Sequence, residues 1–144
     1  MFFKLLIGFI FFANAPHITD ADGWFPVTQP AKGQEERVDI DPSIWVLFMK
    51  RLDSKQCSIR FPVDPVYRTT EGGFMARAAA FGEIFEWTVQ KGAGETGDST
   101  YELDGKWVHE HVVQSGEYLF KLRTYSLGPE SLHHEAFVAS LKLD

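Results

Sequence analysis

Cysteine is almost absent from this chain, because Cys57 is the only one among its 144 residues. A single thiol excludes an intramolecular disulfide, so a protein that works outside the cytoplasm must take its stability from packing. Basic residues are also in deficit, with 14 Lys and Arg against 20 Asp and Glu and a net charge of -6. Without a basic cluster that could release counterions from phosphates, the sequence predicts no nucleic-acid partner.

Long apolar runs are missing too, and the most apolar segment lies near the N-terminus. Lys4 precedes an apolar run over residues 5–12, and small residues follow at Ala13 and Ala15. This pattern is typical of a signal peptide, and the run is too short to cross about 30 Å of hydrocarbon as a helix. We predict a signal peptide over residues 1–21, export to the periplasm or the outside of the cell, and no stable membrane span after cleavage.

The cleavage point itself has two candidates. A cut after Ala15 would leave Pro16 directly behind it, whereas a cut after Ala21 avoids that proline but lies farther from the apolar run. The alternative to a signal peptide is a buried N-terminal helix, which would have to hide phenylalanines around its whole circumference.

Recognisable catalytic motifs are absent as well. No glycine-rich loop follows a strand and opens a helix, so a nucleotide site is unsupported. The carboxylates show no spacing suited to general acid and base catalysis, and Cys57 has no histidine nearby in sequence that could serve as its base. We therefore predict a protein that is not an enzyme and that needs no cofactor.

The remaining chain divides into a lead-in and one domain. Residues 22–41 mix proline, glycine and charge, which predicts an irregular segment whose small apolar patch contains Trp24. Residues 42–144 are then enough for a single domain with one core. Its first segment, residues 42–51, leaves two alternatives open: Asp41 and Pro42 are typical of a helix start, whereas the bulky apolar run that follows favours a strand.

Alternation of polar and apolar residues predicts the strands of this domain. Residues 58–63 alternate in this way, and the prolines at their end predict that this strand either runs at a sheet edge or stops at Pro62. Two hairpins follow, over residues 74–90 around Gly82 and over residues 107–125 around Gly116.

The segments between and after the hairpins complete the predicted fold. Residues 91–98 predict a mobile loop, and apolar residues at helical spacing predict an amphipathic helix over residues 131–141. The expected fold class is α+β. An antiparallel sheet of about five strands would pack against the C-terminal helix, with a second helix near residues 42–51 in the helical alternative.

Three segments of the domain resemble the PsbP/Mog1-like family. They are residues 58–65 (SIRFPVDP), residues 118–122 (YLFKL) and the closing residues 136–143 (AFVASLKL). The resemblance covers about residues 58–143, although the substantial central helix of family members has no counterpart here, since residues 91–105 are short and glycine-rich. It implies a non-enzymatic binding or assembly factor and brings no catalytic residues with it.

Two sets of residues are candidates for a functional site. Trp24 and Trp87 lie outside the predicted core and could anchor an unknown protein partner or small ligand, because tryptophan is enriched at binding hot spots. The favoured function is therefore an exported, non-enzymatic binding or assembly protein without a metal site.

Histidines support the alternative function. His109 and His111 share one face of a predicted strand, and His133 and His134 could approach them from the predicted helix. Imidazoles gathered in this way bind zinc or copper. The alternative is a small exported metal-binding protein or metal-dependent hydrolase.

Overall fold

The computed structural model describes residues 42–143, and these are mostly β, with 63% in strands. The elements are, in chain order, η1 (Pro42–Ile44), β1 (Val46–Leu52), β2 (Lys55–Phe61), β3 (Val66–Thr70), β4 (Gly73–Ala80), β5 (Glu83–Lys91), β6 (Gly97–Leu103), β7 (Lys106–Ser115), β8 (Tyr118–Ser126), α2 (His134–Ala139) and β9 (Lys142–Leu143). The predicted signal peptide, the lead-in and Trp24 lie outside the described residues.

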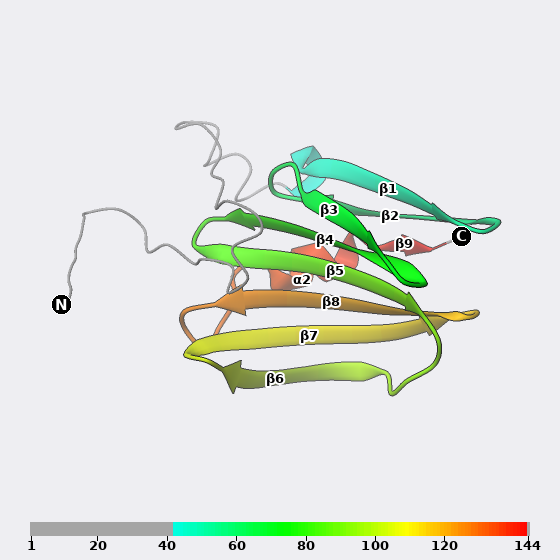
Figure 1. Cartoon of the computed structure of the whole chain (residues 1–144). Helices are drawn as coiled ribbons and strands as arrows, with labels where there is room; N and C mark the ends of the chain where they lie inside the picture. The colour runs from blue at the N-terminus through cyan, green and yellow to red at the C-terminus, as the bar shows by residue number, and fades with distance from the viewer. Residues whose placement is uncertain (1–41, 144) are drawn as a thin grey trace.

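Two antiparallel sheets make up the fold (Figure 1). The smaller has three strands in the order β1-β2-β9, and the larger has six in the order β3-β4-β5-β8-β7-β6. The predicted α+β class, with one sheet of about five strands packed against a C-terminal helix, is therefore wrong. The smaller sheet provides much of the cover that was expected from the helix, and α2 is only six residues long.

Two missed strands explain much of this difference. All five residues of β3 are exposed, and six of the seven in β6 are exposed. A strand that buries neither face shows no alternation of apolar and polar residues, so periodicity cannot detect it. Pairing with a neighbouring strand holds it instead, β3 with β4 and β6 with β7.

The segment that could have been helix or strand forms a strand. After the short turn η1, β1 pairs along its whole length with β2, from Val46 opposite Phe61 to Leu52 opposite Lys55. Its side chains alternate, since Phe48 packs against the core whereas Met49 is 51% exposed. The predicted second helix near residues 42–51 is absent from this part of the described chain.

The core lies between the two sheets and is rich in aromatic rings. Trp87 and Phe85 of the larger sheet are fully buried, as is Phe61 of the smaller sheet. Phe137 of α2 joins them, with its ring centre 5.2 Å from that of Phe61 and 5.4 Å from that of Phe85. Burial of such large side chains is the dominant stabilising term for the domain.

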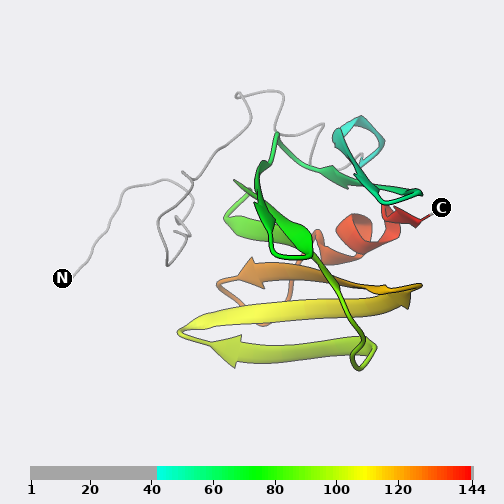
Figure 2. The same cartoon turned by 45° about the vertical axis from the view of Figure 1, so that its right-hand side comes forward.

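Helix α2 lies in the wedge between the sheets, against β2 and β8 (Figure 2). The larger sheet extends beyond this helix, and within residues 42–143 no other helix or strand lies over the same face of β7 and β6 (Figures 1 and 2). On this face the side chains of β7 are partly exposed, and those of β6 are exposed. No helix of residues 42–143 is long and apolar enough to cross a membrane.

Candidate functional site

A groove of about 350 Å³ lies where α2 meets the uncovered inner face of β6 and β7. We call it the histidine groove and define it by the following residues: Asp98 and Thr100 of β6, His109 and His111 of β7, and His134 and Glu135 of α2. Val138 adds an apolar wall. The residues that line this groove include three imidazoles and no Lys or Arg.

Strand alternation brings the β7 histidines together. Residues two apart on a strand point to the same side, so the prediction that His109 and His111 share a face is confirmed by their register. Thr100 lies opposite His109 on β6, and Asp98 lies opposite His111. Glu110, between the two histidines, points to the outer face of the sheet, where its carboxylate accepts a hydrogen bond from Arg123 at 2.6 Å.

An oxygen atom lies near Nδ1 of each groove imidazole. Nδ1 of His111 is 2.5 Å from the carboxylate of Asp98, and Nδ1 of His134 is 2.7 Å from the hydroxyl of Thr124. The contact between Nδ1 of His109 and the hydroxyl of Thr100 is longer, at 3.5 Å. Because a carboxylate only accepts hydrogen bonds, His111 must donate through Nδ1, which leaves the lone pair of its neutral ring on Nε2.

His134 carries the clearest electrostatic signal of the groove. Burial lowers its pKa to about 4, and His109 and His111 contribute in the same direction. The ring centres of His134 and His109 are 5.6 Å apart. His134 is therefore a neutral imidazole at pH 7, able to accept a hydrogen bond or to ligate a metal ion.

His133 does not belong to the groove, although it neighbours His134 in sequence. It is only 5% exposed, its ring stacks on Phe81 with centres 4.9 Å apart, and its Nδ1 is 3.4 Å from the carboxylate of Glu83. The Glu83 carboxylate also accepts a hydrogen bond from the hydroxyl of Ser131. His133 thus links the start of α2 to the turn between β4 and β5. Of the four histidines predicted for the alternative site, three line the groove.

The other residues singled out by the sequence lie in the core or beyond the described chain. Trp87 is fully buried, and its ring meets Phe74 edge to face with centres 5.0 Å apart. It cannot contact a partner in the folded protein. Cys57 is also buried, and its thiol donates a weak hydrogen bond to the carbonyl of Lys50 at 3.4 Å.

Asp98, Thr100 and Thr124 belong to the site or its support, and sequence reasoning missed all three, whereas Glu135 was expected beside His134 on the helix. Asp98 and Thr100 lay in or next to a segment predicted as a loop. A signal was nonetheless present, because Asp104-Gly105 is the two-residue turn typical of a tight hairpin. Asp104 and Gly105 both have positive φ, 52° and 81°, and they connect β6 to β7.

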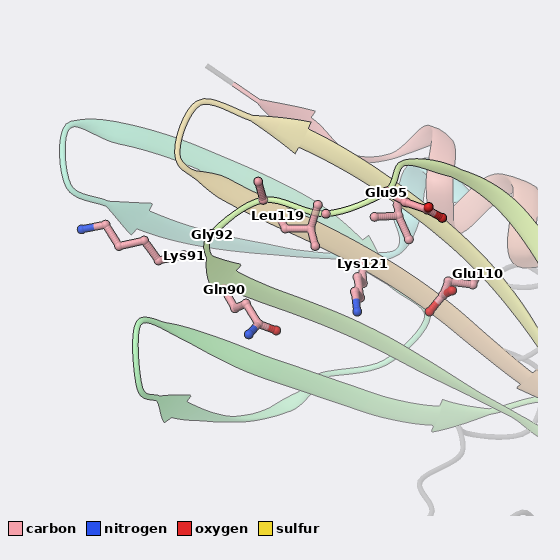
Figure 3. A pocket seen from close by; sticks show the side chains of 10 residues that line it. Gln90, Lys91, Gly92, Glu95, Glu110, Leu119 and Lys121 are labelled. Atoms are coloured by element: carbon pink, nitrogen blue, oxygen red, sulfur yellow. The ribbon is translucent and has the colours of Figure 1, made fainter.

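A second hollow, of about 400 Å³, lies on the outer face of the larger sheet. Figure 3 shows it beneath the loop that follows β5, with Leu119 under that loop. Its charged lining residues are of both signs, with Lys91 and Lys121 beside Glu95 and Glu110. Lys91 lies within reach of Glu117, at 3.9 Å. Such a balanced surface shows less chemical preference than the histidine groove.

As the side chains stand, residues 42–143 contain no group of three or more His, Cys, Asp or Glu placed to hold a metal ion. What the histidine groove presents is a set of oriented imidazoles on two strands and a helix. Comparisons with protein-family models, with curated proteins and with solved structures found no match to this chain.

Proposed function

We propose that this protein is an exported, non-enzymatic binding protein with a PsbP/Mog1-like domain, and that it takes its ligand or protein partner in the histidine groove. One observation carries this proposal. Three imidazoles from β7 and α2 line a single open groove beside the core, and secondary structure holds all three. Sites of this kind, mostly preformed and with a few convergent polar groups, are typical of binding proteins.

Two of the segments that carry the family resemblance lie side by side in the fold. The two most distinctive segments, residues 58–65 and residues 136–143, contact each other through the rings of Phe61 and Phe137. The hydroxyl of Ser140 also accepts a hydrogen bond from the backbone N–H of Arg60 at 3.0 Å.

Two hydroxyl groups beside the groove, those of Thr124 and Ser126, are poorly placed to act as nucleophiles. A serine or threonine nucleophile must be accessible and activated by a base. Thr124 is fully buried, and Ser126, which is 3.4 Å from Nε2 of His109, is 3% exposed and donates its proton to the carbonyl of Gly128. Neither oxygen is open to a substrate.

Crosslinking in cells that produce the protein tests the binding role of the groove. A photoreactive residue at Glu135, on the rim of the groove, should give a discrete crosslinked product. The same residue at Glu71, in the exposed turn between β3 and β4, is the matched control and should give none. Equal products from both positions, or none from either, would contradict the proposal.

Export is tested separately. N-terminal sequencing of the protein recovered from the extracytoplasmic fraction should begin at residue 16 or residue 22. Recovery of the intact chain from the cytosol alone would contradict this part of the proposal.

A second candidate function has its own supporting observation. The hydrogen bonds on Nδ1 of His111 and His134 leave Nε2 of both rings free of hydrogen bonds within the described residues. This favours the alternative of a metal-binding protein, or of a metal-dependent hydrolase, with its metal site in the histidine groove.

A further inference from the structure

Imidazoles that bind metal ions share a recognisable arrangement. One ring nitrogen ligates the metal, while the other forms a hydrogen bond to a carboxylate, carbonyl or water that fixes the tautomer and the orientation of the ring. His111 with Asp98 has this arrangement, and His134 with Thr124 has a similar one through a hydroxyl. Ordinary surface histidines need no such partners.

The spacing of the rings also suits a metal ion. Two imidazoles that share one ion through bonds of about 2.0–2.1 Å have ring centres about 5–6 Å apart. The centres of His109 and His134 are 5.6 Å apart. His111 follows two positions after His109 on the same strand face, which places their Cα atoms about 7 Å apart. The third ring must rotate to reach the ion, because no three His, Cys, Asp or Glu of residues 42–143 are placed for a metal as the side chains stand.

The charge around the groove is favourable to a cation. The carboxylates of Asp98 and Glu135 line it together with the three imidazoles, and its lining holds no Lys or Arg. Neutral imidazole suits zinc, copper and nickel, whereas magnesium and calcium prefer sites made of oxygen atoms.

We propose that the histidine groove binds a divalent transition-metal ion, Zn²⁺ or Cu²⁺, through Nε2 of His111 and His134 and Nδ1 of His109, whose Nε2 lies 3.4 Å from the hydroxyl of Ser126. Asp98 and Thr124 are positioning residues that orient two of these rings. The inference deepens the proposed function, on which it rests, by naming the ligand class of the same groove. It excludes His133 from the site, because that ring is buried against Phe81 and Glu83.

Calorimetric titration of the full-length, chelator-washed chain with Zn²⁺, Cu²⁺ and Mg²⁺ tests the proposal. We expect one equivalent of Zn²⁺ or Cu²⁺ to bind at micromolar or lower concentration, and Mg²⁺ to give no signal. His111→Asn should weaken binding at least tenfold. Absence of binding to the unmodified chain at 100 micromolar metal would overturn the proposal.

A matched pair of variants separates a positioning role from general charge. Asp98→Asn should weaken metal binding about tenfold or more, as expected for loss of an outer-shell partner. Glu102→Asn removes a carboxylate from the same face of the same strand, but it lies outside the groove lining and should leave affinity unchanged. Equal losses from both variants would mean that Asp98 acts only through its charge.

A measurement on the unmodified protein covers the case in which a variant fails to fold. Substoichiometric Cu²⁺ should broaden the imidazole NMR signals of His109, His111 and His134 first, and those of His133 later. Broadening centred on any other residues would overturn the assignment. If metal binding fails while the Glu135 crosslink persists, the groove binds its partner without metal and the proposed function stands; if both fail, so does the proposed function.

Discussion

Glu86 is a buried carboxylate whose removal should lower the stability of the domain substantially. It is 2% exposed on the outer face of the larger sheet. One carboxylate oxygen is 2.9 Å from Nε of Arg77, and the other is 3.3 Å from the guanidinium of Arg123. Tyr125 donates its hydroxyl hydrogen to the second oxygen at 3.1 Å, and burial, with Glu86, raises the pKa of Tyr125 to about 12. The carboxylate thus ties β4, β5 and β8 together.

The size of the expected stability loss depends on which interactions the partners of Glu86 keep in the variant. Breaking a buried ion pair by removing one member costs about 3–5 kcal/mol when the other charge is left uncompensated. In Glu86→Gln the amide keeps an acceptor for Tyr125, and Arg123 keeps Glu110 at 2.6 Å. The side chain of Arg123 is also 25% exposed. We therefore expect a loss of roughly 2–3 kcal/mol in the free energy of unfolding, equivalent to about 10 °C in Tm.

Urea unfolding of the full-length chain, followed by tryptophan fluorescence, measures this loss. Buried Trp45 and Trp87 make fluorescence sensitive to opening of the core. Glu102→Gln, at an exposed position of β6, is the control and should change stability by less than about 0.5 kcal/mol. A loss below about 0.5 kcal/mol for Glu86→Gln would refute the view that this ion cluster stabilises the sheet.

Three further perturbations follow from the structure. Gly73→Ala should cost at least about 3 kcal/mol, because the added Cβ would lie 1.8 Å from the carbonyl oxygen of Val89; urea unfolding measures the loss. Ser140→Ala should cost about 1–2 kcal/mol, since the side chain accepts a hydrogen bond from Arg60 and donates one to the carbonyl of Phe137. Because the pKa of His134 is lowered to about 4, stability should fall by about 2 kcal/mol, after discounting for partial exposure, as the pH falls from about 6.5 to about 4.

Each of these expectations has a control and a contradicting result. Gly128→Ala adds a methyl group to open space, and an equal loss there would show that the Gly73 effect is not steric. Ser99→Ala, at an exposed position, is the control for Ser140→Ala, which should differ from it clearly. The pH series is run with EDTA, and His134→Gln should remove part of the slope because the unfolded state can no longer gain that proton; an unchanged slope would contradict the assignment to His134.

Local features of the chain were largely predictable from the sequence. Alternation and turn residues indicated the β4–β5 and β7–β8 hairpins, and both are confirmed by their pairing. The same alternation placed His109 and His111 on one face and Glu110 on the other. Period-2 patterning is a property of the strand itself, so it can be detected before any partner strand is known.

The division into two sheets was decided by tertiary structure. β3 and β6 are exposed on nearly all of their residues, so pairing with a neighbour determines them, and no hydrophobic pattern does. The apolar run of β1 suits a helix or a strand equally, and β2 as a partner selects the strand.

Which histidines form the groove was likewise determined partly by the sequence and partly by the tertiary structure. His133 and His134 are adjacent, yet one ring is buried against Phe81 and the other lines the groove. His133 is the N-cap of α2 and His134 is its first residue, and the burial of Phe137 between Phe61 and Phe85 fixes the rotation of α2. The sequence by itself determined that imidazoles were available and which ones shared a strand face; only the docking of the helix decided which of the two adjacent histidines at its start reaches them.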